Sequence, residues 1–189
     1  MKLTLLRHTR TAMPSGVCYG QYDAPLAEGF REEAQMLKQR LPEVAFERVI
    51  SSPRLRCTHL AEALFPDRTL QKEPALLEMH FGTWENKAWN AIDPDALQQW
   101  MDDFVNASPP GGENLLTLAR RVHAWLDGLD QAREAEWLVV THAGVLRCVW
   151  AWMLELPLEN IFKIPVGYGE VLRLQLHPDP ARRSILQKA

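Results

Sequence analysis

Two histidines and two arginines stand in the sequence where apolar, strand-like segments end. Arg7 and His8 follow one such segment directly, and His142 follows another. Arg54 comes shortly after a third. A neutral imidazole is a nucleophile near neutral pH, and guanidinium groups bind phosphate oxygens through paired, charge-assisted hydrogen bonds. If these four side chains converge, they form a site suited to transfer of a phosphoryl group.

The elements that must position these residues are strands that alternate with helices. Short apolar runs predict buried strands at 2–7, 46–50 and 136–141. Helical spacing or helix-start signals mark the segments 28–41, 51–64, 113–133 and 145–156. This order predicts an α/β fold, a three-layer α/β/α sandwich with a mainly parallel sheet. Ligands of such sheets bind at the carboxyl ends of the strands, so we expect the four side chains at one edge.

The remaining segments are shorter or less regular. Ser51 and Ser52 are candidate N-caps, with Pro53 at the first position of the second helix. Asp93 and Pro94 predict the start of a further helix. Gly and Pro make 12–26 a loop, short strands are expected at 70–72 and 171–176, and the polar tail from Pro178 is expected to fray.

The bulk composition predicts a single domain in the cytoplasm. The 189 residues are 47% hydrophobic, which suits a single domain over 1–189, with a lid-like insertion at about 74–112. The net charge of −3 gives no sign of nucleic-acid or membrane partners, and no targeting or membrane-spanning segment stands out. The three cysteines are far apart, and the six histidines form neither HExxH nor a Cys/His quartet, so we expect reduced thiols and no metal.

Each residue of the constellation also has a simpler explanation. His8 alone could be a satisfied polar group, and His142 could only cap a helix. Arg54 could be a solvated residue of a first helical turn, although a cation is unfavourable there unless an anion lies nearby. Arg7 is harder to explain in this way, because a buried guanidinium needs an anion. The convergence of all four favours a phosphate site.

Four motifs in this order, LLRHTRT, SSPRLRCTHLAEAL, LLEMHFGTWEN and VVTHAG, carry a family resemblance. The chain resembles the histidine phosphatase superfamily, also called the phosphoglycerate mutase-like family. The resemblance implies that fold, no cofactor, and a small phosphomonoester as substrate. It implies that His8 is the nucleophile and becomes transiently phosphorylated, and that Arg7, Arg54 and His142 form the phosphate pocket. Thr11 and Gln21 are further candidates for contacts with the phosphate or the substrate.

The leaving oxygen of such a reaction needs a proton from a carboxyl group. The resemblance implies that Glu78 is this proton donor. Its apolar sequence neighbours are consistent with the role, because desolvation raises the pKa of a carboxyl group. Glu85, in GTWEN, is the competing acid.

Smaller features indicate a branch of the family. Thr9 replaces the glycine of the common RHG motif, and Met13-Pro14 stands where mutases carry an asparagine. CYGQYDAPL, FGTWEN and PPGGEN resemble the α-ribazole phosphatase branch, which implies α-ribazole 5′-phosphate as substrate and a role in cobalamin biosynthesis. Trp84 or Trp89 could stack on its planar base, although core packing explains any one tryptophan as well.

Other functions stay open at this point. They are a broad-specificity sugar-phosphate phosphatase, a small phosphoglycerate mutase, a protein phosphohistidine phosphatase, and an inactive module that only binds a phosphate ligand. The apolar residues within 84–104 could close over a ligand or form the contact of a homodimer.

Overall fold

Six strands form one sheet at the centre of the protein, in the order β4-β3-β6-β1-β7-β8. The computed structural model describes residues 1–188. Four neighbouring strands are parallel: β1 (Lys2–Arg7), β3 (Arg48–Ser51), β4 (Leu70–Lys72) and β6 (Glu136–Thr141). Two strands complete the sheet in the antiparallel sense: β7 (Val171–Gln175) and β8 (Ser184–Lys188). The mainly parallel sheet predicted from the alternating pattern is confirmed.

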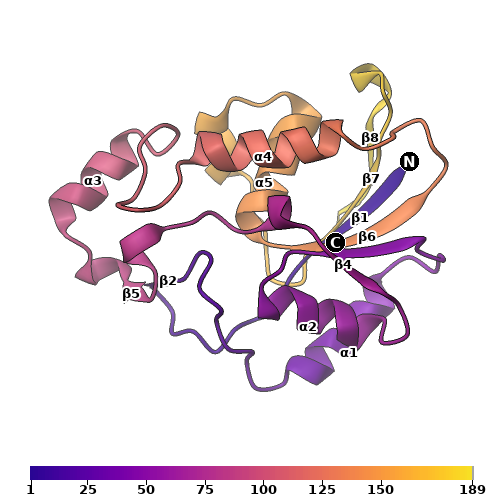
Figure 1. Cartoon of the computed structure of the whole chain (residues 1–189), viewed down its shortest axis with the longest axis horizontal. Coiled ribbons are helices and arrows are strands. Elements are labelled where there is room, and N and C mark those ends of the chain that lie inside the picture. Colours follow the sequence, from indigo (N-terminus) through magenta and orange to yellow (C-terminus); the bar gives the residue numbers. More distant parts are fainter. Residues whose placement is uncertain (189) are drawn as a thin grey trace.

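Helices cover both faces of this sheet (Figure 1). One face carries α1 (Phe30–Arg40) and α2 (Leu55–Leu64), and the other carries α4 (Leu115–Asp127) and α5 (Ala143–Leu154). Alternate residues of β1 serve the two layers: Leu3 and Leu5 pack with α4 and α5, and Leu6 packs with α1 and α2. This is the three-layer sandwich expected from the sequence.

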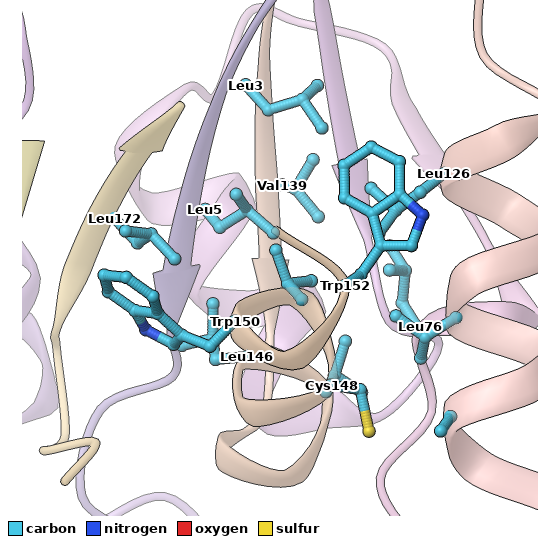
Figure 2. Packing of buried hydrophobic residues seen from close by; sticks show 14 of the residues in the cluster. Leu3, Leu5, Leu76, Leu126, Val139, Leu146, Cys148, Trp150, Trp152 and Leu172 are labelled. Atoms are coloured by element: carbon cyan, nitrogen blue, oxygen red, sulfur yellow. The ribbon is translucent and has the colours of Figure 1, made fainter. Parts of the chain in front are cut away.

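The larger core lies between the sheet and α5. Figure 2 shows Trp150 and Leu146 of α5 facing Leu5 and Leu172 of the sheet. Leu5, Leu146 and Leu172 are fully buried, and a buried leucine contributes roughly 1.5–3 kcal/mol through the hydrophobic effect. The packing fixes α5 against β1, and the N-terminus of α5 is one wall of the site described below.

The chain from 74 to 112 leaves the sandwich and forms an extension beyond the carboxyl ends of the parallel strands (Figure 1). It contains α3 (Pro94–Asp102) and β5 (Lys87–Ala88), which pairs with β2 (Val17–Cys18) of the 12–26 loop. Asp93 caps α3 through a 2.9 Å hydrogen bond from the backbone N–H of Ala96, as the Asp-Pro sequence predicts. Five short 3₁₀ turns complete the chain: η1 (Pro74–Leu76), η2 (Gly82–Trp84), η3 (Trp89–Ala91), η4 (Leu158–Lys163) and η5 (Pro180–Arg182).

Three local expectations are wrong. α2 begins at Leu55, and neither serine caps it; Asp23 of the 12–26 loop accepts the N–H of Leu55 instead, at 3.0 Å. α4 ends at Asp127, six residues earlier than the pattern suggests. The tail does not fray, because its backbone pairs with β7 to form β8. Within residues 1–188, no helix combines the length and apolarity that a membrane crossing needs.

Candidate active site

His8 lies directly after β1, and its side chain is only 2% exposed. Its Nδ1 is 2.7 Å from the carbonyl oxygen of Thr9. A carbonyl can only accept, so Nδ1 carries the proton and Nε2 keeps its lone pair, toward which Nε of Arg56 donates at 3.3 Å. Burial, followed by the cations Arg56 and Arg7, holds the pKa of His8 well below its usual range. The side chain is therefore a neutral imidazole with its nucleophilic nitrogen fixed in place.

Arg56 lies between the two site histidines, a position that the sequence analysis assigned to Arg54. Its Nε is 3.3 Å from Nε2 of His8 and 3.2 Å from Nδ1 of His142. Its other nitrogens donate to the carbonyl oxygens of Tyr22, at 2.8 Å, and Gly20, at 2.6 Å. The side chain is fully buried, and within residues 1–188 no carboxylate pairs with it. A buried cation without a counter-ion makes an anion site.

Arg7 adds a second cation to the site. It donates to the carbonyl oxygen of Val166 at 2.7 Å, and its guanidinium carbon lies 3.8 Å from the ring centre of Tyr168. No ion pair involves it within the described part of the chain. Arg54, by contrast, is 30% exposed and lies 3.4 Å from both Asp23 and Gln21, outside the pair of histidines.

His142 is the N-cap residue of α5 and is fully buried. Because its Nδ1 accepts from Arg56, its Nε2 carries the proton of the neutral ring and donates to Oγ of Ser52, 2.7 Å away. Burial is the main cause that lowers the pKa of His142 well below its usual range, and Arg56 adds to it. The rings of His8 and His142 lie 5.2 Å apart edge to face, so the two predicted histidines do share one site.

Glu78 lines one cavity together with Arg7 and His8. Its Oε2 accepts the backbone N–H of Gly144 in the first turn of α5 at 3.1 Å, and its Oε1 accepts its neighbour's N–H at 3.1 Å. The carboxyl group therefore contacts the first turn of α5 and a backbone donor of its own segment. The surroundings are thus more polar than the neighbours in sequence suggest, because Leu76 and Met79 turn their side chains into the core.

The backbone of Glu78 is held from two sides. Arg121 of α4 donates to its carbonyl oxygen at 3.0 Å and pairs with Glu113 at 2.7 Å. Gln21 donates its side-chain amide to the same carbonyl at 2.9 Å. These contacts fix where the carboxyl group stands, and they make Gln21 a neighbour of Glu78 with no place in the cavity wall.

Glu85 and Thr11, two other candidates from the sequence, have no direct place at the cavity. Oε1 of Glu85 accepts the backbone N–H groups of Gln21 and Phe81 at 2.8 and 3.1 Å, so it ties two loops together. Thr11 forms an isolated β-bridge with Leu26 in the 12–26 loop. Of the two acids considered, only Glu78 lines the cavity.

The cavity at His8 has a volume of about 360 Å³, and Arg7, Glu78 and Arg147 are its charged lining residues. Tyr19 and Tyr168, from two separate loops, lie beside His8 and Arg7 with their hydroxyl groups 2.9 Å apart. Burial raises the pKa of Tyr19 to about 12, so it stays a neutral hydrogen-bonding group. The arrangement suits a phosphoryl group: the unprotonated nitrogen of His8, the cation of Arg7 and a carboxyl group belong to residues of one cavity wall, and the buried cation of Arg56 contacts His8 although it does not line the cavity. Within residues 1–188 no three His, Cys, Asp or Glu side chains cluster as a metal site would require.

Sequence reasoning missed Arg56, Ser52, Arg121 and Arg147 as members of this neighbourhood. For Arg56 a signal was present, because Arg56, Leu60 and Leu64 recur every four residues and share the buried face of α2. A lone arginine on an apolar helix face indicates a buried charge that binds a partner or ligand.

Comparison with known proteins gives a consistent picture. The family described as the histidine phosphatase superfamily (branch 1) matches residues 3–186. The adenosylcobalamin/alpha-ribazole phosphatase of Salmonella typhimurium is 31% identical over 176 residues, which cover 89% of this chain and 87% of the relative. A probable phosphoglycerate mutase, GpmB, of Yersinia pestis is 30% identical over 165 residues, with 83% and 76% of the two chains covered.

A solved structure agrees with these relatives. The alpha-ribazole phosphatase from Shigella flexneri superimposes with a TM-score of 0.86 at 28% identity, covering 94% of this chain and 92% of that one. The family match spans nearly the whole chain, and the fold follows with it. The chain therefore belongs to the histidine phosphatase superfamily, branch 1, and is a hydrolase of phosphomonoesters.

Proposed function

We propose that this chain hydrolyses α-ribazole 5′-phosphate to α-ribazole and phosphate, through a phosphohistidine intermediate at His8. The observation that carries the proposal is the buried, neutral His8, whose lone-pair nitrogen Nε2 faces the unpaired cation of Arg56 at 3.3 Å. That nitrogen attacks phosphorus, the bond from phosphorus to the ribose 5′-oxygen breaks, and Arg7 and Arg56 stabilise the charge on the phosphoryl oxygens. His142 belongs to the phosphate pocket by positioning Arg56, whose Nε lies 3.2 Å from its Nδ1.

Glu78 acts on the leaving group in this scheme. A proton that arrives with the singly protonated phosphate ester is held at the carboxyl group and passes to the ribose oxygen as it leaves. In the second step, Glu78 takes a proton from water while the water oxygen attacks phosphohistidine, which frees His8 and inorganic phosphate. The hydrogen bonds from Gly144 and from residue 79 keep the carboxyl group in position through both steps.

The choice of substrate is supported by the relatives from Salmonella typhimurium and Shigella flexneri, which both bear the name alpha-ribazole phosphatase. The same resemblance supports placing the reaction in cobalamin biosynthesis. The probable mutase among the relatives makes a phosphoglycerate mutase the second candidate.

Two measurements test the proposal. Rapid quenching with labelled substrate should trap an acid-labile, alkali-stable phosphoprotein in the wild type and none in His8→Asn, and substantial turnover by purified His8→Asn would refute the nucleophile. Phosphate release in EDTA should give a kcat/KM on α-ribazole 5′-phosphate about tenfold or more above sugar phosphates, phosphoglycerates and nucleoside monophosphates. Equal values across the panel would refute α-ribazole 5′-phosphate as the specific substrate but would leave the proposed phosphatase mechanism standing. Transfer of the phosphoryl group to a second phosphoglycerate would favour the mutase.

A further inference from the structure

A second hollow with a different character lies beside the phosphate cavity. It has a volume of about 540 Å³ and takes its walls from the extension and from η4. We name it the aromatic groove, and six of its lining residues are Phe81, Trp89, Leu97, Trp100, Phe104 and Phe162. Apart from the indole nitrogens of the tryptophans, these side chains carry no polar group. The groove is large enough for a flat bicyclic ring and offers it almost only carbon surface.

The aromatic groove adjoins the cavity at His8. Phe81 and Trp89 line both the groove and the cavity that holds His8. A smaller apolar recess joins them on another side, because Phe81 and Phe162 of the groove also line it, together with Glu78 and Arg147. The groove therefore lies next to two hollows that Glu78 lines, and Glu78 is the acid proposed for the leaving oxygen.

The aromatic side chains that line the groove already form stacked and edge-to-face pairs with one another. Trp89 and Trp100 are nearly parallel, with ring centres 6.3 Å apart, and Phe81 stands edge-on to Trp89 at 5.5 Å. Such walls attract a further planar ring by stacking and by burial of apolar area. Trp84, the other tryptophan proposed for stacking, is 5% exposed and packs with Cys18 and Ile92, so Trp89 is the one of these two candidates that lines the groove, together with Trp100.

We infer that the aromatic groove is the subsite for the base of the substrate, and that it selects an apolar, uncharged bicycle over a nucleobase. This inference rests on the proposed function and adds the source of its specificity. The amino and carbonyl groups of guanine or cytosine would lose their hydrogen bonds to water in the groove, whereas dimethylbenzimidazole on ribose exposes only one ring nitrogen. On this inference we expect nucleoside monophosphates to be poorer substrates than α-ribazole 5′-phosphate.

Met101 provides the test, because it lines the groove, is 54% exposed on α3, and does not line the phosphate cavity. Met101→Glu places a carboxylate beside the bound base at little expected cost to folding. The ratio of kcat/KM on α-ribazole 5′-phosphate to kcat/KM on ribose 5-phosphate should fall about tenfold. Met36→Glu is the matched control, because Met36 is 58% exposed on α1, away from the groove, and should leave both values unchanged.

An unchanged ratio in Met101→Glu, or an equal loss on both substrates, would overturn the inference. So would a wild-type dimer that Met101→Glu dissociates in size-exclusion chromatography, since the groove would then be a contact between copies. If the wild type shows no preference for α-ribazole 5′-phosphate, the proposed substrate is refuted. The inference about the groove is then tested separately, by comparing kcat/KM on 1-naphthyl phosphate and phenyl phosphate in the wild type and in Met101→Glu. A loss confined to the naphthyl ester in Met101→Glu would still support a subsite for bicyclic rings, and no such loss would refute it.

Discussion

Arg56 differs from its near neighbour Arg54 in what surrounds the charge. Arg56 is fully buried and contacts both histidines, whereas Arg54 is partly exposed beside Asp23. We expect Arg56→Met to lower kcat/KM by about 10²–10³, as the loss of a preorganised charge at a transition state does. Arg54→Met should lower it less than about tenfold, because an exposed ion pair contributes little. Steady-state kinetics with circular dichroism as the folding control measures both, and a larger loss in Arg54→Met would return the phosphate contact to Arg54.

Gly144 leaves room for the catalytic acid proposed here. A Cβ at this position would overlap Oε1 of Glu78, so Gly144→Ala must displace the carboxyl group. We expect kcat for an alkyl phosphate to fall about tenfold or more, with a smaller loss on p-nitrophenyl phosphate, whose leaving group needs little protonation. Gly167→Ala is the matched control, because a Cβ there meets nothing within 4 Å. Equal losses on both esters in Gly144→Ala would place the acid elsewhere.

At the scale of elements, the loop 12–26 holds the start of α2 in place. Asp23 accepts the N–H of Leu55, and the carbonyl oxygens of Gly20 and Tyr22 receive Arg56. Asp23→Ala should lower the free energy of unfolding by about 1 kcal/mol, as the loss of a helix cap does, and lower Tm by about 2–4 °C. Asp23→Asn keeps the acceptor and should retain most of this stability. Urea unfolding distinguishes the two, and equal losses would mean that the charge of Asp23 matters and the cap does not.

β1 and β6 could be predicted from sequence because their side chains are buried on both faces, and they begin and end where the apolar runs do. β4 has the predicted bounds although Gln71 and Lys72 are exposed, and the start of α3 follows from its Asp-Pro cap. β8 could not be predicted, because an edge strand pairs through its backbone and leaves Ile185 and Leu186 exposed. The start of α2 was missed for a related reason: its cap comes from Asp23, 32 residues away, and no local pattern encodes it.

The same limit separates the predictable part of the site from the rest. His8 and His142 could be placed together because each follows a parallel strand, and strand ends meet at one sheet edge. Which arginine lies on the buried face depends on where α2 begins. The sequence predicts a start at Pro53, but α2 begins at Leu55, and Arg56 is then buried while Arg54 is partly exposed. Gln21 and Thr11 lie in an irregular loop, whose side-chain directions no periodic pattern records.

At the scale of the whole molecule, the rest of the fold must offset the free-energy cost of the buried polar and charged groups of the site. Two neutral imidazoles are buried beside two arginines that pair with no carboxylate within residues 1–188, and the pKa values of the imidazoles are lowered mainly by burial. Such buried polar groups lower the stability of a fold relative to well-packed apolar side chains of similar volume. The free energy of unfolding should therefore vary with pH in a way that reflects the buried histidines of the site.

We expect the free energy of unfolding to fall as the pH drops below about 6.5, where histidines of the unfolded chain take up protons. His8 and His142 stay neutral in the folded protein at that pH, since both folded pKa values are lowered. Their contribution is thus fully present above the unfolded pKa and is lost as the pH falls toward the folded values, by up to about 1.4 kcal/mol per pH unit for each histidine. Urea unfolding between about pH 6 and about pH 5 should show a slope in His8→Asn that is lower than the wild-type slope by that amount. An identical slope in the two proteins would mean that His8 binds its proton as readily in the folded protein as in the unfolded chain, which would refute the lowered pKa of His8.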